Sequence, residues 1–384
     1  MYPIYMDNHA TTRVDERVLA VMLPYFCEHY GNSSLTMHRY ARRAESAVDG
    51  ARLQVAKIIG ATKDEIFFTG TATESINLAI KGAAFANKNH GEHIITSMAE
   101  HKAVLNSCQS LEKQGFKVTY LKPESDGRIL PEKVFTAITD RTILVTLMLA
   151  NNENGVIHDV KTIGKELSKR KILFHIDAVQ GVGKIPFDVT SSHSDYVSLS
   201  AHKMYGPKGV AALFIRKNPN TLMEPLTDGG GQEQGIRSGT HNVSGIVGFG
   251  EACRIAQEEM PEESQRLLNL RESLHQKIIS QLDGVFLNGP LENRLPGNLN
   301  MSFAEIEGDV LLASLIEIAV SSGSACSAGN QNSSHVLRAQ GVPDDLAKAA
   351  IRFGLGRYNT QEEVDFAAQL VIRHVKRLRQ FSAF

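Results

Sequence analysis

The stretch that decides the fold class is Ile172-Leu173-Phe174-His175-Ile176-Asp177-Ala178-Val179-Gln180. A short, mostly apolar run ends in a carboxylate, which is typical of a buried parallel strand that presents a ligand-binding side chain at its carboxyl end. A second run, 196–199, leads into Ser200-Ala201-His202-Lys203 and a glycine-rich turn. Lys203 follows Asp177 by 26 residues, about the length of one βαβ unit. We therefore expect an α/β sheet that presents both side chains.

The segments on either side repeat this alternation of strand and helix. Residues 40–59 have apolar side chains at helical spacing and predict an amphipathic helix. Between the short apolar runs lie helical segments that supply crossovers, so the fold class is α/β. The other strands are expected at Ile66–Thr69, His93–Ser97, Lys117–Leu121, Ile143–Leu149 and Val210–Ile215.

The composition of the sequence changes near Thr227. A polar, glycine-rich segment runs to Gly245, and a long charged helix is expected over 247–282. Beyond it we expect strands at 298–302, 319–322 and 350–353, and a last helix that begins after a capping signature, Thr360-Gln361-Glu362-Glu363. We place the main domain boundary near residue 256.

Composition and charge exclude several classes of protein. Lys and Arg number 41 against 42 Asp and Glu in 384 residues, so the net charge of −1 argues against a nucleic-acid-binding surface. The longest apolar stretch, 143–150, is too short to cross a membrane. The four cysteines are scattered, which argues against a disulfide framework and against a structural metal site. The N-terminus has no signal-peptide pattern, and free thiols fit a reducing compartment, so we expect a cytoplasmic protein.

Lys203 and Asp177 together suggest a cofactor. A lysine after a strand can form a Schiff base with an aldehyde. A carboxylate beside it is the arrangement that pyridoxal 5'-phosphate needs, because it keeps the pyridine nitrogen protonated. Taken singly, Lys203 also fits a surface lysine and Asp177 also fits a helix N-cap.

Four further segments carry candidate chemistry, each with a simpler alternative. The turn 70–74 precedes a helix and suits a phosphate, although threonine also merely caps helices. His101 follows a strand and could stack on a ring or carry protons, or could be structural. Cys326 lies in a run of small residues typical of a mobile loop, where a thiol acts as a nucleophile if its pKa is lowered, or is incidental. The other cysteines, Cys27, Cys108 and Cys253, are expected to be inert packing residues. Arg352 lies inside a strand and needs an anion, either a substrate carboxylate or a structural partner.

These motifs, in this order, resemble those of the cysteine desulfurases of the NifS/IscS-like group in the class V aminotransferase family. The resemblance runs nearly end to end. It rests on Asp7-Asn8-His9-Ala10-Thr11-Thr12, Ala72-Thr73-Glu74-Ser75, Glu100-His101-Lys102-Ala103-Val104, Asn151-Asn152-Glu153, His175-Ile176-Asp177-Ala178-Val179-Gln180, Ser200-Ala201-His202-Lys203, Arg237-Ser238-Gly239-Thr240 and Ser321-Ser322-Gly323-Ser324-Ala325-Cys326.

The resemblance implies a fold and a set of roles. The fold is that of pyridoxal-phosphate enzymes of type I: a large domain over 15–256 with a mostly parallel seven-stranded sheet, and a smaller α+β domain made of 1–14 and 257–384. It also implies a homodimer with sites at the subunit interface. By position, Lys203 resembles the Schiff-base lysine, Asp177 the partner of the pyridinium nitrogen, and Gln180 the ligand of the ring hydroxyl. His101 resembles the residue that stacks on the ring and carries a proton, and Cys326 resembles the persulfide-forming nucleophile. The residues that resemble phosphate binders are Ala72, Thr73, Ser200 and His202, with Thr240 from the neighbouring subunit, and those that resemble the substrate-carboxylate side are Asn152 and Arg352.

The implied reaction converts L-cysteine to L-alanine and leaves a persulfide on Cys326, whose sulfur would pass to an acceptor protein such as an iron–sulfur cluster scaffold. The chain ends at Phe384, without the tail with which the IscS branch is expected to contact that scaffold, which favours the NifS branch. Two other functions stay open. One is a different type I enzyme, either an aminotransferase or a selenocysteine lyase. An aminotransferase would not need Cys326. The other is a persulfide relay without turnover, against which Lys203 and Asp177 speak.

Overall fold

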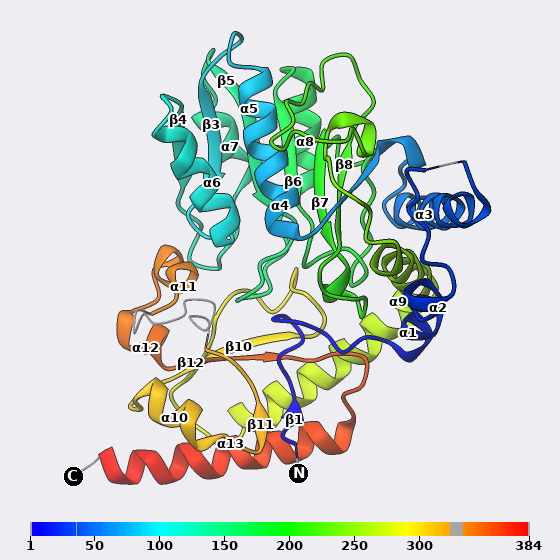
Figure 1. The fold of residues 1–384 in the computed structure, drawn as a ribbon. Coiled ribbons are helices and arrows are strands. Elements are labelled where there is room, and N and C mark those ends of the chain that lie inside the picture. The colour runs from blue at the N-terminus through cyan, green and yellow to red at the C-terminus, as the bar shows by residue number, and fades with distance from the viewer. Residues whose placement is uncertain (1, 36, 323–332, 383–384) are drawn as a thin grey trace.

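A mostly parallel seven-stranded sheet forms the larger part of the molecule. The computed structural model describes residues 2–35, 37–322 and 333–382. The strand order is β2-β8-β7-β6-β5-β3-β4, and only β8 runs antiparallel to its two neighbours. Helices cover both faces (Figure 1), so the expected α/β sheet is confirmed. The strands are β2 Ile66–Thr69, β3 His93–Ser97, β4 Lys117–Leu121, β5 Thr142–Met148, β6 Leu173–Asp177, β7 Tyr196–Ser200 and β8 Ala211–Ile215.

Two-sided burial explains why several of these strands are continuously apolar. Successive side chains of a strand point to opposite faces. Leu173 packs into the hydrophobic cluster on one face and Phe174 into the cluster on the other, and Leu213 and Phe214 divide in the same way. The helices of this part are α3 Arg39–Ile58, α4 Ala72–Asn77, the π-helical turn Leu78–Gly82, α5 Ala83–Ala86, α6 Lys102–Glu112, α7 Pro131–Ala137 and α8 Val160–Lys169.

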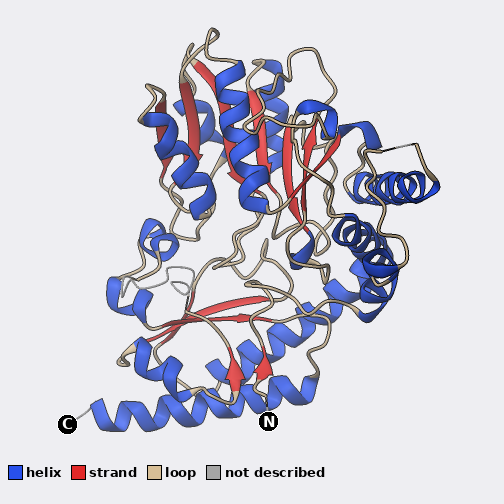
Figure 2. Ribbon diagram, in the orientation of Figure 1, coloured by secondary structure: helices blue, strands red, loops and turns tan. Residues whose placement is uncertain are grey.

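The smaller part contains an antiparallel sheet of order β12-β10-β9 and a parallel pair, β1-β11 (Figure 2). The last helix begins as predicted: Thr360 and Glu363 exchange backbone-to-side-chain hydrogen bonds in a capping box. The strand expected over 319–322 is shorter and begins one residue earlier. The elements are β1 Ile4–Tyr5, β9 Val285–Leu287, β10 Asn298–Phe303, α10 Gly308–Ser314, β11 Ile318–Ala319, α11 His335–Gln340, α12 Asp344–Lys348, β12 Ala350–Gly354 and α13 Gln361–Ser382.

One long helix, α9 Val243–Ile279, joins the two parts. It begins four residues before the predicted start, because the Asn242 side chain accepts a hydrogen bond from the backbone N–H of Gly245 and caps it. Its apolar side chains up to Ile255 belong to the core under the large sheet, and those from Leu267 onward belong to the core of the small part. The division at residue 256 stays a prediction.

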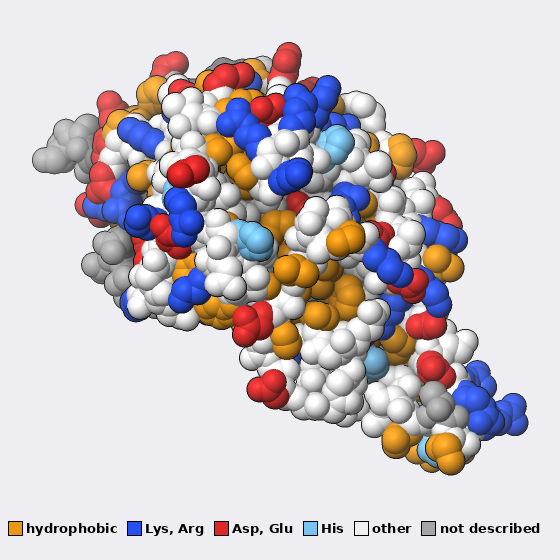
Figure 3. Space-filling model, turned by 90° about the horizontal axis from the view of Figure 1, so that it is seen from above, with side chains coloured by type: hydrophobic (Ala, Val, Ile, Leu, Met, Phe, Trp, Pro, Cys, Tyr) orange, Lys and Arg blue, Asp and Glu red, His pale blue; other side chains and the backbone are white. Residues whose placement is uncertain are grey.

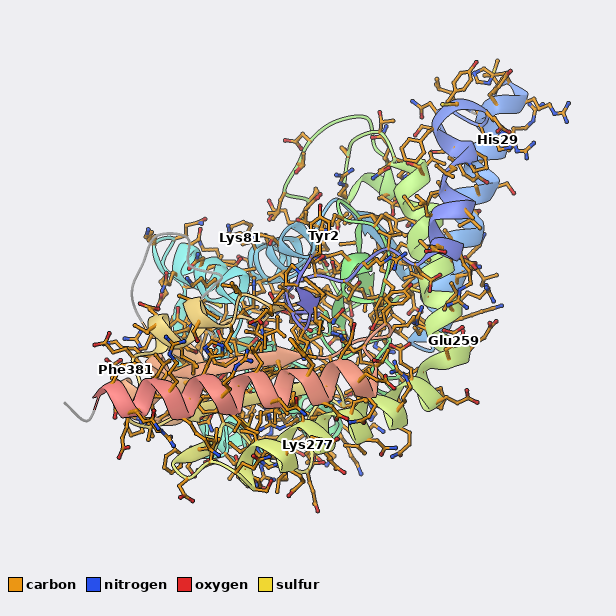
Figure 4. All side chains as sticks on the ribbon, turned by 90° about the horizontal axis from the view of Figure 1, so that it is seen from below. Tyr2, His29, Lys81, Glu259, Lys277 and Phe381 are labelled. Carbon is orange, nitrogen blue, oxygen red and sulfur yellow. The ribbon has the colours of Figure 1, made fainter. Side chains whose placement is uncertain are left out.

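The first helices of the large part form an arm that projects from the rest of the molecule. Figure 4 shows His29 near its tip, and it shows α13 with Phe381 lying along the segment of α9 that carries Lys277. The arm consists of α1 Glu16–Met22, α2 Pro24–Cys27 and the first turns of α3. Across the described part of the chain, no helix is both long and apolar enough to span a bilayer.

Candidate active site

A cavity of about 460 Å³ lies at the carboxyl ends of the large sheet's strands. Met148, Asp177 and Ser200 close β5, β6 and β7 respectively and all line it. This is the edge at which parallel α/β sheets bind ligands. The structure brings ten of the twelve predicted site residues to this cavity: Ala72, Thr73, His101, Asn152, Asp177, Gln180, Ser200, His202, Lys203 and Arg352.

Lys203 and Asp177 both line the cavity. The Lys203 ammonium donates to the carbonyl oxygens of His9 (2.6 Å) and Ala10 (2.7 Å). The Asp177 carboxylate accepts from the backbone N–H of Val179 (3.1 Å) and is 5% exposed. Burial raises the pKa of Asp177 to about 6, and the Lys203 charge opposes that shift. A cationic nitrogen in the cavity would therefore complete the environment of this carboxylate.

His101 caps the helix α6 that follows β3. Its Nδ1 accepts a hydrogen bond from the backbone N–H of Ala103 (3.1 Å), so the hydrogen of the neutral ring lies on Nε2. Burial lowers the pKa of His101, and the charges of Lys203 and Lys102 act in the same direction. The cavity therefore holds a neutral imidazole with one N–H to donate. The preceding Glu100 is fully buried, and burial raises its pKa well above the usual value.

One end of the cavity is formed by the start of α4. Thr71 caps this helix, with its Oγ1 accepting from the backbone N–H of Glu74 (3.2 Å). The first N–H groups of a helix have no partner within it, so those of Ala72 and Thr73 are available to an anion. His202 lines the same cavity: burial lowers its pKa to about 4, so the ring is neutral, and Thr11 Oγ1 lies 3.1 Å from its Nδ1.

Arg352 reaches the cavity from β12 in the small part and is 2% exposed. Its Nη1 donates to the carbonyl oxygen of Asn152 (2.9 Å) and its Nη2 to Oδ1 of Asp7 (2.6 Å). Its buried Nε has no partner within the described residues. Arg352 therefore forms the structural ion pair that the sequence left open, and it still borders the space that a substrate would fill.

Two predicted residues are not in this cavity, and one expectation about cysteines is wrong. Thr240 is exposed and does not line the cavity of its own chain. Cys326 lies outside the described residues. Cys108 and Cys253 are buried as expected, but Cys27 is exposed, because the short helix α2 that carries it projects on the arm.

The sequence reasoning gave no role to His9 and Ala10, which accept the Lys203 hydrogen bonds. Both belong to the quoted stretch 7–12, so a signal was present. Their role is made by backbone carbonyls, which a reading of side chains does not detect. The exposed Lys208 and the neighbouring Gly209 also line the cavity without having been predicted.

The donor set fits pyridoxal 5'-phosphate. A buried carboxylate suits a pyridinium nitrogen, free N–H groups at a helix start suit a phosphate, and a lysine between them suits the aldehyde. The described residues hold no cluster of side chains suited to a metal ion. The fold and this donor set define a class: an α/β enzyme with the cofactor site of a type I pyridoxal-phosphate protein.

Comparison with known proteins places the chain within that class. The family described as aminotransferase class-V matches residues 4–366. A cysteine desulfurase IscS of Anaeromyxobacter sp. (strain Fw109-5) is 52% identical over 99% of this chain and 94% of its own length. The cysteine desulfurase of Rattus norvegicus is 49% identical over 99% of this chain and 84% of its own length.

Two solved structures support the same placement. A NifS-like protein has a TM-score of 0.91 and 41% identity, covering 98% of this chain and all of that one. SspA in complex with cysteine has a TM-score of 0.83 and 38% identity, covering 93% of this chain and all of that one. This chain belongs to the aminotransferase class-V family and, within it, to the cysteine desulfurases. Relatives with either the IscS or the NifS name are similar to it, so these comparisons do not separate the two branches.

Proposed function

We propose that this chain binds pyridoxal 5'-phosphate through Lys203 and converts L-cysteine to L-alanine, with the sulfur passing to Cys326. The observation that carries the proposal is the meeting of Lys203 and Asp177, from the ends of two adjacent strands, in one cavity with a phosphate-binding helix start. The family to which the chain belongs supports the substrate class, and a relative of known structure is described in complex with cysteine.

The cofactor would be held from three sides. Lys203 would hold its aldehyde carbon, Asp177 its pyridine nitrogen, and His101 would stack on its ring. Ala72, Thr73, Ser200 and His202 would surround its phosphate. When bound, pyridoxal phosphate supplies an electron sink that stabilises negative charge at the substrate's α-carbon.

The protein's own residues would then move the protons and the sulfur. The Lys203 amine would remove the proton from the substrate's α-carbon. The neutral His101 carries a proton for the sulfur step, and Asn152 with Arg352 orients the substrate carboxylate. The Cys326 thiolate attacks the substrate sulfur: an S–S bond forms, the C–S bond breaks, and its electron pair stays on carbon, which takes up a proton.

The residues that flank the undescribed segment 323–332 support this role for Cys326. Ser321 Oγ donates to Asp7 Oδ1 (3.0 Å), and Asp7 holds Arg352 at the cavity. On the far side, His335 Nε2 lies 2.9 Å from the carbonyl oxygen of Glu100, next to His101. Cys326 follows Ser322 by four positions in the sequence, and four residue steps of chain reach at most about 14 Å.

The nucleophile is tested by a pair of variants. Cys326→Ser should bind pyridoxal phosphate normally and change its absorbance on addition of L-cysteine, yet release almost no alanine, because a hydroxyl is a poor nucleophile toward sulfur. Cys27→Ser is the matched control, since Cys27 is an exposed thiol that lies on the arm, outside the cavity. Alanine, sulfide and a persulfide on Cys326 are measured by mass spectrometry. Wild-type alanine production by Cys326→Ser would favour the lyase or aminotransferase instead.

We propose further that the protein is a homodimer in which Thr240 completes the partner's phosphate site. Thr240 is exposed, and the adjacent His241 lies with its Nδ1 2.8 Å from Ser33 Oγ, in the segment that joins α2 to α3. The arm exposes apolar side chains, as Figure 3 shows at its projecting end, and exposed apolar patches mark interaction sites. They are Leu19, Leu23, Phe26, Tyr30, Met37 and Tyr40.

A charge placed in that patch should separate the subunits. Phe26→Asp combined with Tyr30→Asp is expected to give a monomer by light scattering, with weaker binding of pyridoxal phosphate because Thr240 is lost from the site. Phe381→Asp is the control, since Phe381 is 69% exposed at the far end of α13. A wild-type monomer with full cofactor occupancy would contradict this arrangement.

The cellular setting follows from the proposed chemistry. A persulfide needs a recipient, and we propose an acceptor protein such as an iron–sulfur cluster scaffold, in the cytoplasm.

A further inference from the structure

Lys184 is a half-buried lysine to which the proposed reaction assigns no role. It lies four residues after Gln180, and its ammonium donates to Oε1 of Gln180 (2.8 Å). Among the described residues it forms no ion pair, because the nearby carboxylate of Glu263 is taken by Arg357 at 2.8 Å. Partial loss of water around an ammonium that has no carboxylate partner is unfavourable, so its position calls for a reason.

The contact fixes the orientation of the Gln180 amide. An ammonium can only donate, so the oxygen of the amide must face Lys184 and the NH₂ must face away. His9 adds to this, since its Nδ1 lies 3.3 Å from the same oxygen. One hydrogen of the NH₂ goes to the carbonyl oxygen of His9 (2.9 Å). The second has no acceptor among the described residues, and Gln180 lines the cavity.

We propose that Lys184 is a positioning residue that acts through Gln180: it makes this wall of the cavity a hydrogen-bond donor, matched to the ring oxygen of pyridoxal phosphate in its anionic form. The inference rests on the proposed cofactor but goes beyond it, because it explains how one side chain is held in the only orientation that recognises that oxygen.

The charges around the cavity support this assignment. Asp177 places a negative charge on one side, where a pyridinium would lie, and Lys184 places a positive charge behind Gln180. Burial lowers the pKa of Lys184 to about 7, with Lys203 and Arg352 acting in the same direction and Glu263 opposing it. The ammonium form therefore prevails below about pH 7, and an anionic oxygen bound in the cavity would favour it further. Burial, together with the charges of Lys184 and Arg352, holds the pKa of His9 well below its usual value, so that ring is neutral. The pair Asp177 and Lys184 is complementary to a ring with a cationic nitrogen and an anionic oxygen.

A double-mutant cycle tests the coupling in the holoenzyme without using turnover. The variants are Lys184→Met, Gln180→Leu and the two combined. The readouts are the dissociation constant of pyridoxal phosphate and the pH midpoint of the bound cofactor's absorbance. Without the ammonium, the Gln180 amide is free to turn its oxygen toward the ligand, which disfavours the anionic form, so Lys184→Met should raise the midpoint by about one pH unit. It should weaken binding about tenfold.

The two substitutions should not add. Once Gln180 is leucine, removing Lys184 should change either readout by less than about twofold or a few tenths of a pH unit. The control is Ser264→Ala, because the Ser264 hydroxyl donates to the Lys184 carbonyl oxygen (2.7 Å) and its loss disturbs the backbone but not the ammonium. If Lys184→Met does not fold, Lys184→Gln gives the same cycle, since a second amide cannot fix the first.

Each outcome has a distinct meaning. Equal effects of the lysine substitution in both backgrounds, or the same shifts in Ser264→Ala, would overturn the role of Lys184 and leave the proposed function intact. Failure of the wild type to take up pyridoxal phosphate on Lys203 would overturn the proposed function and this inference with it.

Discussion

The cavity has two walls that are built by different means. The wall formed by the large sheet consists of strand ends, and Asp177, Ser200 and Lys203 lie within 27 consecutive residues. The opposite wall comes from the small part, where Arg352 is held by Asp7, a residue 345 positions away in the chain. The first wall is therefore fixed by local strand geometry, whereas the second depends on one buried long-range ion pair. Substitutions on each wall therefore test two different kinds of support.

The largest effect is expected on the sheet wall, where the chemistry is concentrated. Lys203→Ala should abolish covalent attachment of the cofactor and lower turnover by about 10⁴-fold or more, since it removes both the attachment point and the base. Borohydride reduction followed by peptide mass spectrometry should find the pyridoxyl group on Lys203 in the wild type. Lys208→Ala should keep that label, although Lys208 also lines the cavity. A pyridoxyl mass on any other lysine would refute the assignment.

Substitutions in the wall from the small part should lower the free energy of unfolding rather than remove a reacting group. Asp7→Asn leaves the buried Arg352 guanidinium without its counter-charge, and breaking such a pair costs about 3 to 5 kcal/mol. Denaturant unfolding measures this loss directly. The double variant Asp7→Asn with Arg352→Met should recover part of it, because no uncompensated charge remains buried. A single variant as stable as the wild type would show that the wall does not depend on this pair.

A smaller effect concerns the charge on the sheet wall itself. The pKa of Asp177 is raised to about 6 in the folded chain from 3.8, so the folded state binds more protons than the unfolded state between these values. The cofactor-free wild type should therefore lose up to about 3 kcal/mol of stability as the pH rises from 4 to 7. Asp177→Asn should lack that loss. The difference in unfolding free energy between the two proteins, measured across this range, should grow with pH, and a flat difference would contradict it.

The same contrast decides what could be predicted from the sequence. The strands of the large sheet were predicted to within one residue at each end, because strands covered on both faces are continuously apolar and the polar side chains that follow them are adjacent in the chain. Ten site residues followed from those positions and from the resemblance. The Asp7–Arg352 pair and the Lys184–Gln180–His9 contacts join segments far apart in sequence, and no local pattern marks them. Cys27 was misplaced for a related reason: its apolar neighbours predict packing, but they lie on a projecting arm.

The smallest expected effects distinguish a buried thiol from an exposed one. Cys108 is fully buried in α6, and burial raises its pKa to about 12, so it packs as a small apolar group and is inert. Cys108→Ser exchanges that sulfur for a hydroxyl in an apolar cluster and should cost about 1 kcal/mol of stability. Cys27→Ser alters only the exposed arm, and the change in unfolding free energy should stay within about 0.5 kcal/mol. Both proteins should retain alanine formation. A mild alkylating reagent should modify Cys27 long before Cys108, and equal rates at the two thiols would mean that the helix α6 opens far more readily than its buried contacts indicate.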